Sequence, residues 1–271
     1  MIKGRYGARF AVQEQRGLPR SDRDVAWLAI TALFAIWVGA ACAPQGGRPM
    51  QVIQRTTITL NEVSPPIELI LIPPRQGAVG GFYIGKYEIT NAQYKAFVDE
   101  TGYDGSDHPS SKFTEPFLGH WVNGTYPDGQ AKHPACYVNW HHAEAFCDWL
   151  SKKTGKVVRL PADDEWEFAA RGEKGRIYPW GDDWQPAFCN WGDEGKTDGY
   201  ELSAPVGSFP SGATPEGVHD LAGNIWEWTA EKSLRGGPWC LDPDSMRAEW
   251  KAIEDTDRAD DKFGFRIVME P

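Results

Sequence analysis

The stretch Arg159–Gly172, with the sequence RLPADDEWEFAARG, is the last segment for which the sequence predicts a regular helix. Ala162 to Arg171 are expected to be helical, and Gly172 is suited to end the helix because glycine accepts a left-handed backbone. This short helix is rich in carboxylates, namely Asp163, Asp164, Glu165 and Glu167. Acidic residues in a first helical turn are stabilised by the helix dipole, which favours a structural role for them over a catalytic one.

Upstream of this helix the sequence predicts two short strands. Glu68–Pro73 is a continuous apolar run, and Gly81–Ile89 alternates between apolar and polar residues. Runs of this length and pattern are typical of strands that contribute to a buried sheet.

Two further helices are expected between these strands and the acidic helix. Thr90 and Gln93 have the spacing of a capping box, and Asn139 is a favourable N-cap for a helix that Gly155 would end. Cys147 falls on the apolar face of the second helix, which favours a buried thiol over a ligand.

Downstream of Gly172, about 100 residues show little helical periodicity. Loops this long are uncommon in compact domains, and bound cations are one physical way to organise them. The chain contains 29 Gly, 20 Pro and 13 Trp, a composition of turns and large packing side chains. We therefore expect an α+β fold with little regular secondary structure, in which tryptophans anchor the loops: Trp180, Trp184, Trp191, Trp226, Trp228, Trp239 and Trp250.

Charge divides the chain into a basic leader and an acidic body. The whole chain carries a net charge of −10. Residues 1–50 carry +4, so residues 51–271 carry −14. An acidic body does not provide the basic face that nucleic-acid binding needs, so no nucleic-acid partner is expected.

The leader contains Val25–Ala43, nineteen residues without a charge, which is close to the length of a membrane-spanning helix. Most of the basic residues of the leader precede this segment. This distribution predicts a cytoplasmic N-terminus and an extracytoplasmic body, either periplasmic or on the cell surface. Three interpretations remain open: a retained anchor, a lipoprotein signal ending at Cys42, and a cleaved signal peptide. The expected organisation is a leader at 1–24, an anchor or signal at 25–43, a linker at 44–66 and a domain at 67–271.

The other four cysteines, Cys136, Cys147, Cys189 and Cys240, show no metal-binding spacing. They are consistent with disulfides in an oxidising compartment or with buried free thiols. The histidines are scattered, and the pair His141 and His142 is interpreted as solvated at a helix start.

Eight segments, in order along the chain, resemble motifs of the formylglycine-generating enzyme (sulfatase-modifying factor) superfamily. They are YIGKYEITNAQY (83–94), VNWHHAEAFCDWL (138–150), RLPADDEWEFAARG (159–172), YPWGD (178–182), APVGSFP (204–210), DLAGNIWEWT (220–229), RGGPW (235–239) and GFRIV (264–268). The resemblance implies the family's decorated C-type lectin fold over 67–271.

The resemblance also implies two calcium sites. The first corresponds to the side chains of Asn190 and Asp198 and the carbonyls of Trp191 and Tyr200. The second corresponds to the side chains of Asp220 and Glu227 and the carbonyls of Gly223 and Ile225. Carboxylate and carbonyl oxygens are the ligands that calcium prefers.

The catalytic motif of the family is where this sequence departs from the pattern. Formylglycine generators bind copper(I) through two cysteines that follow Gly-Gly, and they oxidise a sulfatase cysteine with oxygen. Here Cys240 stands one position early, Met246 lies near the second position, and Pro238 replaces the family's serine. A copper site is therefore not expected; Cys240 is the one catalytic candidate, with a structural or disulfide-bonded role as its alternative.

Two functions follow from the resemblance. The first is an exported, membrane-anchored domain that binds a peptide or protein partner in the family's groove, for example as an accessory subunit of a membrane complex. The alternative is a divergent oxidoreductase acting on a thiol, a phenol or a siderophore-like substrate. Cys240 and the missing second cysteine are the features that separate them.

Overall fold

The computed structural model describes residues 53–75, 80–110, 116–192 and 198–271, so the leader and the segment 25–43 lie outside the described residues. No helix among the described residues is long and apolar enough to span a membrane. The described residues all belong to one compact unit.

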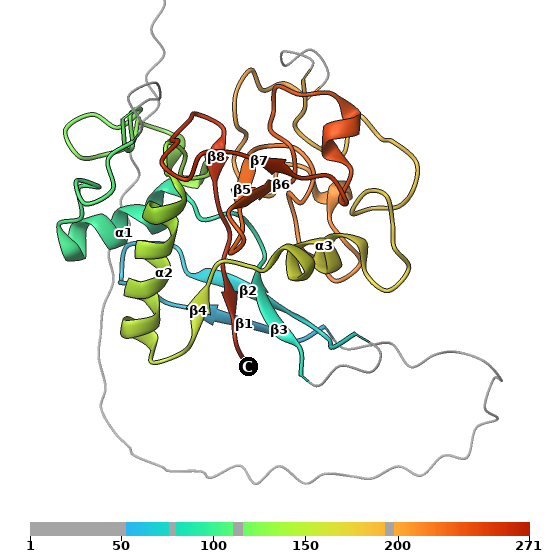
Figure 1. Ribbon diagram of the computed structural model, residues 1–271, viewed down its shortest axis with the longest axis horizontal. Helices are drawn as coiled ribbons and strands as arrows, with labels where there is room; N and C mark the ends of the chain where they lie inside the picture. Colours follow the sequence, from blue (N-terminus) through green and yellow to red (C-terminus); the bar gives the residue numbers. More distant parts are fainter. Residues whose placement is uncertain (1–52, 76–79, 111–115, 193–197) are drawn as a thin grey trace, which may run out of the picture. The chain divides into compact units, whose positions relative to one another are not determined.

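The unit combines two sheets with three α-helices (Figure 1). The five-stranded sheet has the order β1-β2-β3-β9-β4, and the four-stranded sheet has the order β7-β6-β5-β8. Every pairing is antiparallel except that of β5 with β8. The strands are β1 (Arg55–Ile58), β2 (Ile67–Ile72), β3 (Phe82–Gly85), β4 (Val158–Arg159), β5 (Trp226–Trp228), β6 (Ser233–Arg235), β7 (Ala252–Ile253), β8 (Phe263–Gly264) and β9 (Val268–Met269).

The three helices begin and end close to the residues that the sequence indicates. They are α1 (Asn91–Thr101), α2 (Trp140–Thr154) and α3 (Asp163–Arg171). Thr90 accepts a hydrogen bond from the Gln93 amide, and the Gln93 side chain accepts one from Thr90, which confirms the predicted capping box. Short 3₁₀ turns occur at Gln130–Lys132, Pro210–Gly212 and Pro243–Met246.

The strand β2 is buried on both faces, because its side chains alternate between two apolar clusters. Ile67 and Leu69 face a large aromatic core with α1 and α2, whereas Ile70 and Ile72 face a smaller core with α3. Accordingly, α1 and α2 lie on one side of the strands and α3 on the other (Figure 1).

One strand prediction and one linker prediction change in the structure. The strand expected over Gly81–Ile89 ends at Gly85, because beyond it the backbone bends and the Ile89 amide pairs with the Phe265 carbonyl, 2.9 Å away. Part of the segment 44–66, interpreted as a linker, forms β1, which pairs with β2 over four residues. A strand of four residues at a sheet edge carries too short a pattern to be recognised in the sequence.

The interpretation of His142 as solvated is wrong. Its side chain is fully buried at the third residue of α2, where Nδ1 accepts a hydrogen bond from the Asn139 amide. Its Nε2 lies 2.9 Å from the His108 carbonyl oxygen, so the neutral ring satisfies two backbone groups. His141 is half-buried instead, and it stacks on His108 with ring centroids 4.1 Å apart.

Candidate functional site

The first predicted calcium set gathers around one turn of the loops that follow α3. The Asp198 carboxylate accepts hydrogen bonds from the backbone amides of Trp191 and Tyr200, at 3.0 and 2.9 Å. The Asn190 side chain is buried and donates to the Leu202 carbonyl at 2.8 Å. Its carbonyl oxygen, Oδ1, is buried and lacks a hydrogen-bond partner. Such an oxygen is costly to leave unpaired, so the turn has a vacant acceptor of the type that a hard cation uses.

The second predicted set is organised around a buried ion pair that the sequence did not reveal. The Glu227 carboxylate accepts two hydrogen bonds from the Arg266 guanidinium, at 2.5 and 2.7 Å, and a third from the Trp166 indole at 2.9 Å. Glu227, Arg266 and Trp166 are all fully buried. The Glu227 carboxylate is therefore already bound by Arg266. A calcium ion at Glu227 would have to share this carboxylate with the guanidinium.

Carboxylate is nevertheless in excess around the second set. Asp220 and Glu88 are buried close to Glu227 and Arg266, so the four side chains carry three acids against one base. Burial raises the pKa of Asp220 to about 6 and raises the pKa of Glu88 well above its usual range, and the charge of Asp220 adds to the shift of Glu88. The Glu88 Oε2 atom, like Asn190 Oδ1, is buried without a hydrogen-bond partner.

Asn224 joins the two sets, a role that sequence reasoning missed. Its Nδ2 donates to Glu88 at 2.9 Å, and its Oδ1 accepts from the Ala204 amide at 2.8 Å and from Asn190 at 3.3 Å. Its backbone has φ 69°, a left-handed conformation that asparagine tolerates better than most residues. The only signal in the sequence is that this asparagine follows Gly223, which is also left-handed with φ 80°.

The donor chemistry of both sets fits calcium. The first set provides a carboxylate, backbone carbonyls and an unpaired amide oxygen; the second provides excess buried carboxylate. A bound cation would offset this buried negative charge, which is unfavourable without a partner. Among the described residues, no three His, Cys, Asp or Glu side chains converge in the manner of a metal site, so any cation would depend on the amide and carbonyl oxygens.

Cys240 lies between Trp239 and Leu241, and backbone hydrogen bonds join these two residues to the loops that carry the two sets. The Trp239 amide donates to the Asn224 carbonyl at 2.9 Å, and the Gly192 amide donates to the Leu241 carbonyl at 2.9 Å. The Cys240 thiol is a free thiol on an exposed residue, and partial burial raises its pKa. Because the thiolate is the reactive and metal-binding form, this environment does not activate Cys240.

Met246, near the position of the family's second cysteine, is a core residue. Its side chain is fully buried and packs with Tyr178 and Ala222. Gly237 permits this packing, since a Cβ at Gly237 would lie 2.7 Å from the Met246 sulfur. The other described cysteines, Cys136, Cys147 and Cys189, are free and buried, and burial raises the pKa of each thiol.

A small pocket of about 150 Å³ includes Asp261 in its wall. It is lined by His120, His133, Cys136 and Asp261, among others, and the Asp261 charge contributes to the raised pKa of Cys240. Burial lowers the pKa of His120 to about 4, so its ring is neutral at physiological pH. The pocket therefore offers neutral imidazole, a thiol and a carboxyl group to a small polar molecule.

Residues 45–271 match the model of the sulfatase-modifying factor enzyme 1-like domain. The chain belongs to this family. It is 32% identical over 248 residues to a bovine protein named inactive C-alpha-formylglycine-generating enzyme 2, covering 72% of this chain and 79% of the relative. It is 31% identical over 198 residues to the mouse formylglycine-generating enzyme, covering 59% of this chain but only 51% of the enzyme. Hercynine oxygenase of Mycobacterium tuberculosis is 27% identical over 71% of this chain and 53% of its own length.

Solved structures show the same fold. PvdO from Pseudomonas aeruginosa superposes with a TM-score of 0.61 at 24% identity, covering 81% of this chain and 92% of PvdO. CarF superposes with a TM-score of 0.55 at 21% identity, covering 71% and 88% of the two chains. The family and its mixed helix-and-sheet fold, predicted from the eight motifs, are thus confirmed.

Proposed function

We propose that this protein is an exported, membrane-anchored binding domain that holds a peptide or protein partner in the groove its family uses for substrate. The observation that carries the proposal is the state of the two positions matching the catalytic cysteines. The Met246 side chain is fully buried, and the pKa of the Cys240 thiol is raised. A pair of thiolates, which copper(I) chemistry needs, is not assembled by this segment.

Calcium enters the proposal as a structural component. Asn190, Trp191, Asp198 and Tyr200 would hold one ion, and Asp220, Gly223, Ile225 and Glu227 a second. Calcium supplies positive charge and a template for oxygen ligands. The residues themselves fix the loops: Asp198 binds two backbone amides, and Asp220 accepts from the Gly207 amide at 2.6 Å.

The leader supports the location in the proposal. The uncharged segment 25–43 after a basic N-terminus suits an anchor, which would keep the domain at the outer face of a membrane. An accessory subunit of a membrane complex is the partner relationship that such an anchor fits. The C-type lectin relationship of the fold, in which loops on a small scaffold form the binding surface, suits the same role.

A divergent oxidoreductase is the second candidate, and its support comes from the relatives. Proteins named formylglycine-generating enzyme and hercynine oxygenase are similar to this chain over more than half of its length. The small pocket lined by Cys136, His120 and Asp261 is where a thiol, a phenol or a siderophore-like substrate would then bind.

Metal analysis and oxygen uptake separate the two candidates. The full chain, purified in detergent, is compared with Cys240→Ser and with Cys42→Ser, a thiol control in the leader. We expect calcium, no stoichiometric copper or iron, and no oxygen uptake with a cysteine-containing peptide. Stoichiometric copper or iron that is lost in Cys240→Ser but kept in Cys42→Ser, together with oxygen uptake, would overturn the binding proposal in favour of the oxidoreductase.

A further inference from the structure

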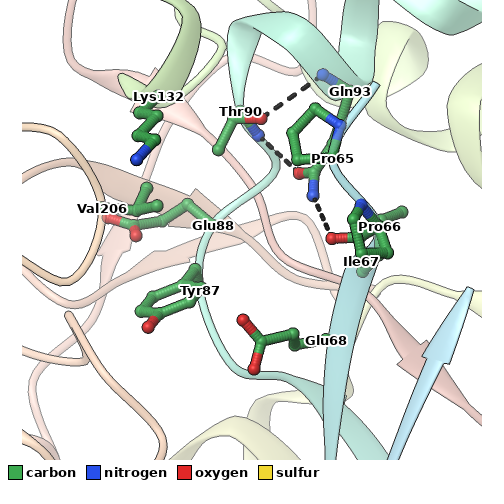
Figure 2. A pocket seen from close by; sticks show the side chains of 10 residues that line it. All are labelled: Pro65, Pro66, Ile67, Glu68, Tyr87, Glu88, Thr90, Gln93, Lys132 and Val206. Atoms are coloured by element: carbon green, nitrogen blue, oxygen red, sulfur yellow. Dashed lines mark hydrogen bonds between the residues drawn. The ribbon is translucent and has the colours of Figure 1, made fainter. Parts of the chain in front are cut away.

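A second cavity, whose lining contains no residue of the Cys240 segment, lies between the start of β2 and the start of α1. It has a volume of about 230 Å³ and is lined by residues from four separate parts of the chain (Figure 2). That volume holds several waters but is smaller than the roughly 300–1,000 Å³ of pockets for drug-sized ligands. Its size therefore suits a molecule with few heavy atoms.

The wall of the cavity is preformed. The Gln93 side chain accepts from the Thr90 amide at 3.0 Å and donates to the Pro66 carbonyl at 3.1 Å, which fixes the chain before β2 against α1. On the other side, the Val206 amide donates to the Lys132 carbonyl at 2.9 Å. A ligand entering the cavity would not have to order its walls, so less binding energy is lost to reorganisation.

The lining combines an apolar surface with opposite charges. Pro65, Pro66, Ile67 and Val206 supply the apolar part, and Tyr87 adds an aromatic ring. Lys132 and Glu68 lie at opposite sides of the cavity (Figure 2). Glu88 also belongs to the wall, but its carboxylate binds Asn224 and is buried, so we assign it no contact with a ligand.

Both charged groups have capacity for a ligand. Lys132 is exposed, and its ammonium forms no hydrogen bond or ion pair with the described residues. Glu68 uses its Oε2 atom for Lys86, at 2.9 Å, and its side chain is 43% exposed. A charge of each sign beside an apolar wall complements a short molecule that carries both an ammonium and a carboxylate group together with an aliphatic side chain.

We infer that this cavity binds a small zwitterion of amino-acid size, with its ammonium at Glu68, its carboxylate at Lys132 and an aliphatic side chain against Pro65, Pro66 and Val206. The site is separate from the Cys240 segment and does not rest on the proposed function. It can therefore be present whether the protein binds a partner or oxidises a substrate.

This inference can be tested by calorimetry on the full chain with three probes that have the same aliphatic side chain. L-Leucine has both charges, leucinamide lacks the carboxylate, and 4-methylpentanoate lacks the ammonium. We expect L-leucine to bind at least tenfold more tightly than either analogue. Leucinamide binding as tightly as L-leucine would overturn the zwitterion in favour of an amino terminus, and 4-methylpentanoate binding as tightly would overturn it in favour of a simple carboxylate.

Two variants test which residue binds each charged group of the ligand. In Lys132→Met, L-leucine should weaken to the level of leucinamide, and leucinamide itself should be unaffected. In Glu68→Gln, L-leucine should weaken to the level of 4-methylpentanoate. Lys152→Met and Glu62→Gln, which change exposed residues outside the lining, should bind as the parent does.

The melting temperature without ligand checks each variant for folding. Partly exposed ion pairs contribute little to stability, so loss of the Glu68–Lys86 pair should barely change the melting temperature and both variants are expected to fold. Absence of saturable L-leucine binding up to roughly 10 mM, or equal binding by the parent and both cavity variants, would overturn the inference.

Discussion

The two parts of the domain bury polar groups in different ways. In the helical part, residues 53–171, four of the six buried polar side chains among the described residues are neutral and bond a backbone group at a helix start: Thr90, Gln93, Asn139 and His142. The other two are Asn91 and Glu88. In the loop part, residues 172–271, charged side chains are buried as well: Asp220, Glu227, Arg235 and Arg266. Both parts contribute to the large aromatic core, since Trp228 and Phe265 of the loop part belong to it, whereas the small cluster of Tyr178, Ala222 and Met246 lies within the loops.

This difference indicates what holds each part together. Capped helices packed on a sheet need only hydrophobic burial and local hydrogen bonds. Long loops lack repeating backbone partners, so ion pairs and amide side chains bind the chain at specific points. The loop part should therefore respond most to changes in charge and to cations, and the helical part to local changes at its caps.

The largest effect is expected from Arg266→Met, which leaves Glu227 buried without its partner. Removing one member of a buried ion pair costs about 3–5 kcal/mol of unfolding free energy, measurable by urea denaturation. The double variant Arg266→Met/Glu227→Gln should recover part of this loss. A loss below about 1 kcal/mol in the single variant would mean that another cation already neutralises Glu227.

Removal of the proposed calcium ions should destabilise the loop part next most strongly. A ligand present at a hundredfold its dissociation constant stabilises by about 2.7 kcal/mol, so a chelator should lower the melting temperature reversibly. Asn190→Ala should reduce the size of the calcium-dependent shift, whereas Asp148→Asn, on an exposed position of α2, should leave it unchanged. Equal shifts in both variants would contradict the placement of an ion at Asn190.

Acidification should act on the helical part through His142. Burial lowers the pKa of His142 to about 4, so between that value and its ordinary value of 6.5 the unfolded chain binds a proton that the folded chain does not. Stability is therefore highest above pH 6.5 and falls as the pH drops toward 4, by at most about 1.4 kcal/mol per pH unit.

A comparison with His142→Asn separates the contribution of His142 to this pH dependence from the contributions of the other histidines. Between pH 7 and pH 5 the parent should lose about 1–2 kcal/mol more than the variant does. Parallel pH profiles would show that His142 accepts a proton without loss of its hydrogen bonds to Asn139 and His108.

The smallest effect is expected from Cys240→Ser, because the residue is exposed and unbonded. Surface substitutions of this kind change the unfolding free energy by less than about 0.5 kcal/mol. Met246→Ala is the contrasting variant, since truncating a buried methionine costs about 2–5 kcal/mol. If Cys240→Ser proved the more damaging of the two, the thiol would have a partner that its position does not indicate.

The sequence predicted the helical part well because its signals are local. The capping residues Thr90 and Asn139 and the final Gly172 lie within a few residues of the backbone groups that they affect. The family motifs then identified the fold, although residue patterns alone reached only an irregular α+β domain.

The candidate site was less predictable, since its key contacts join distant positions. Glu227 and Arg266 are 39 residues apart, and Glu88 and Asn224 are 136 apart. No periodic pattern encodes such pairs. Resemblance named Asn190, Asp198, Asp220 and Glu227 as ligands, but it did not show that Arg266 engages Glu227 or that Asn224 joins the two sets.

Asn224 has a consequence for how the domain can vary. Its single amide must donate on one side and accept on the other, on a left-handed backbone, and its main chain also holds Trp239. Aspartate lacks the donor, and glutamine has a longer side chain. A substitution at Asn224 would therefore disturb the segment that carries Cys240 as well as the contacts between the two predicted calcium sets.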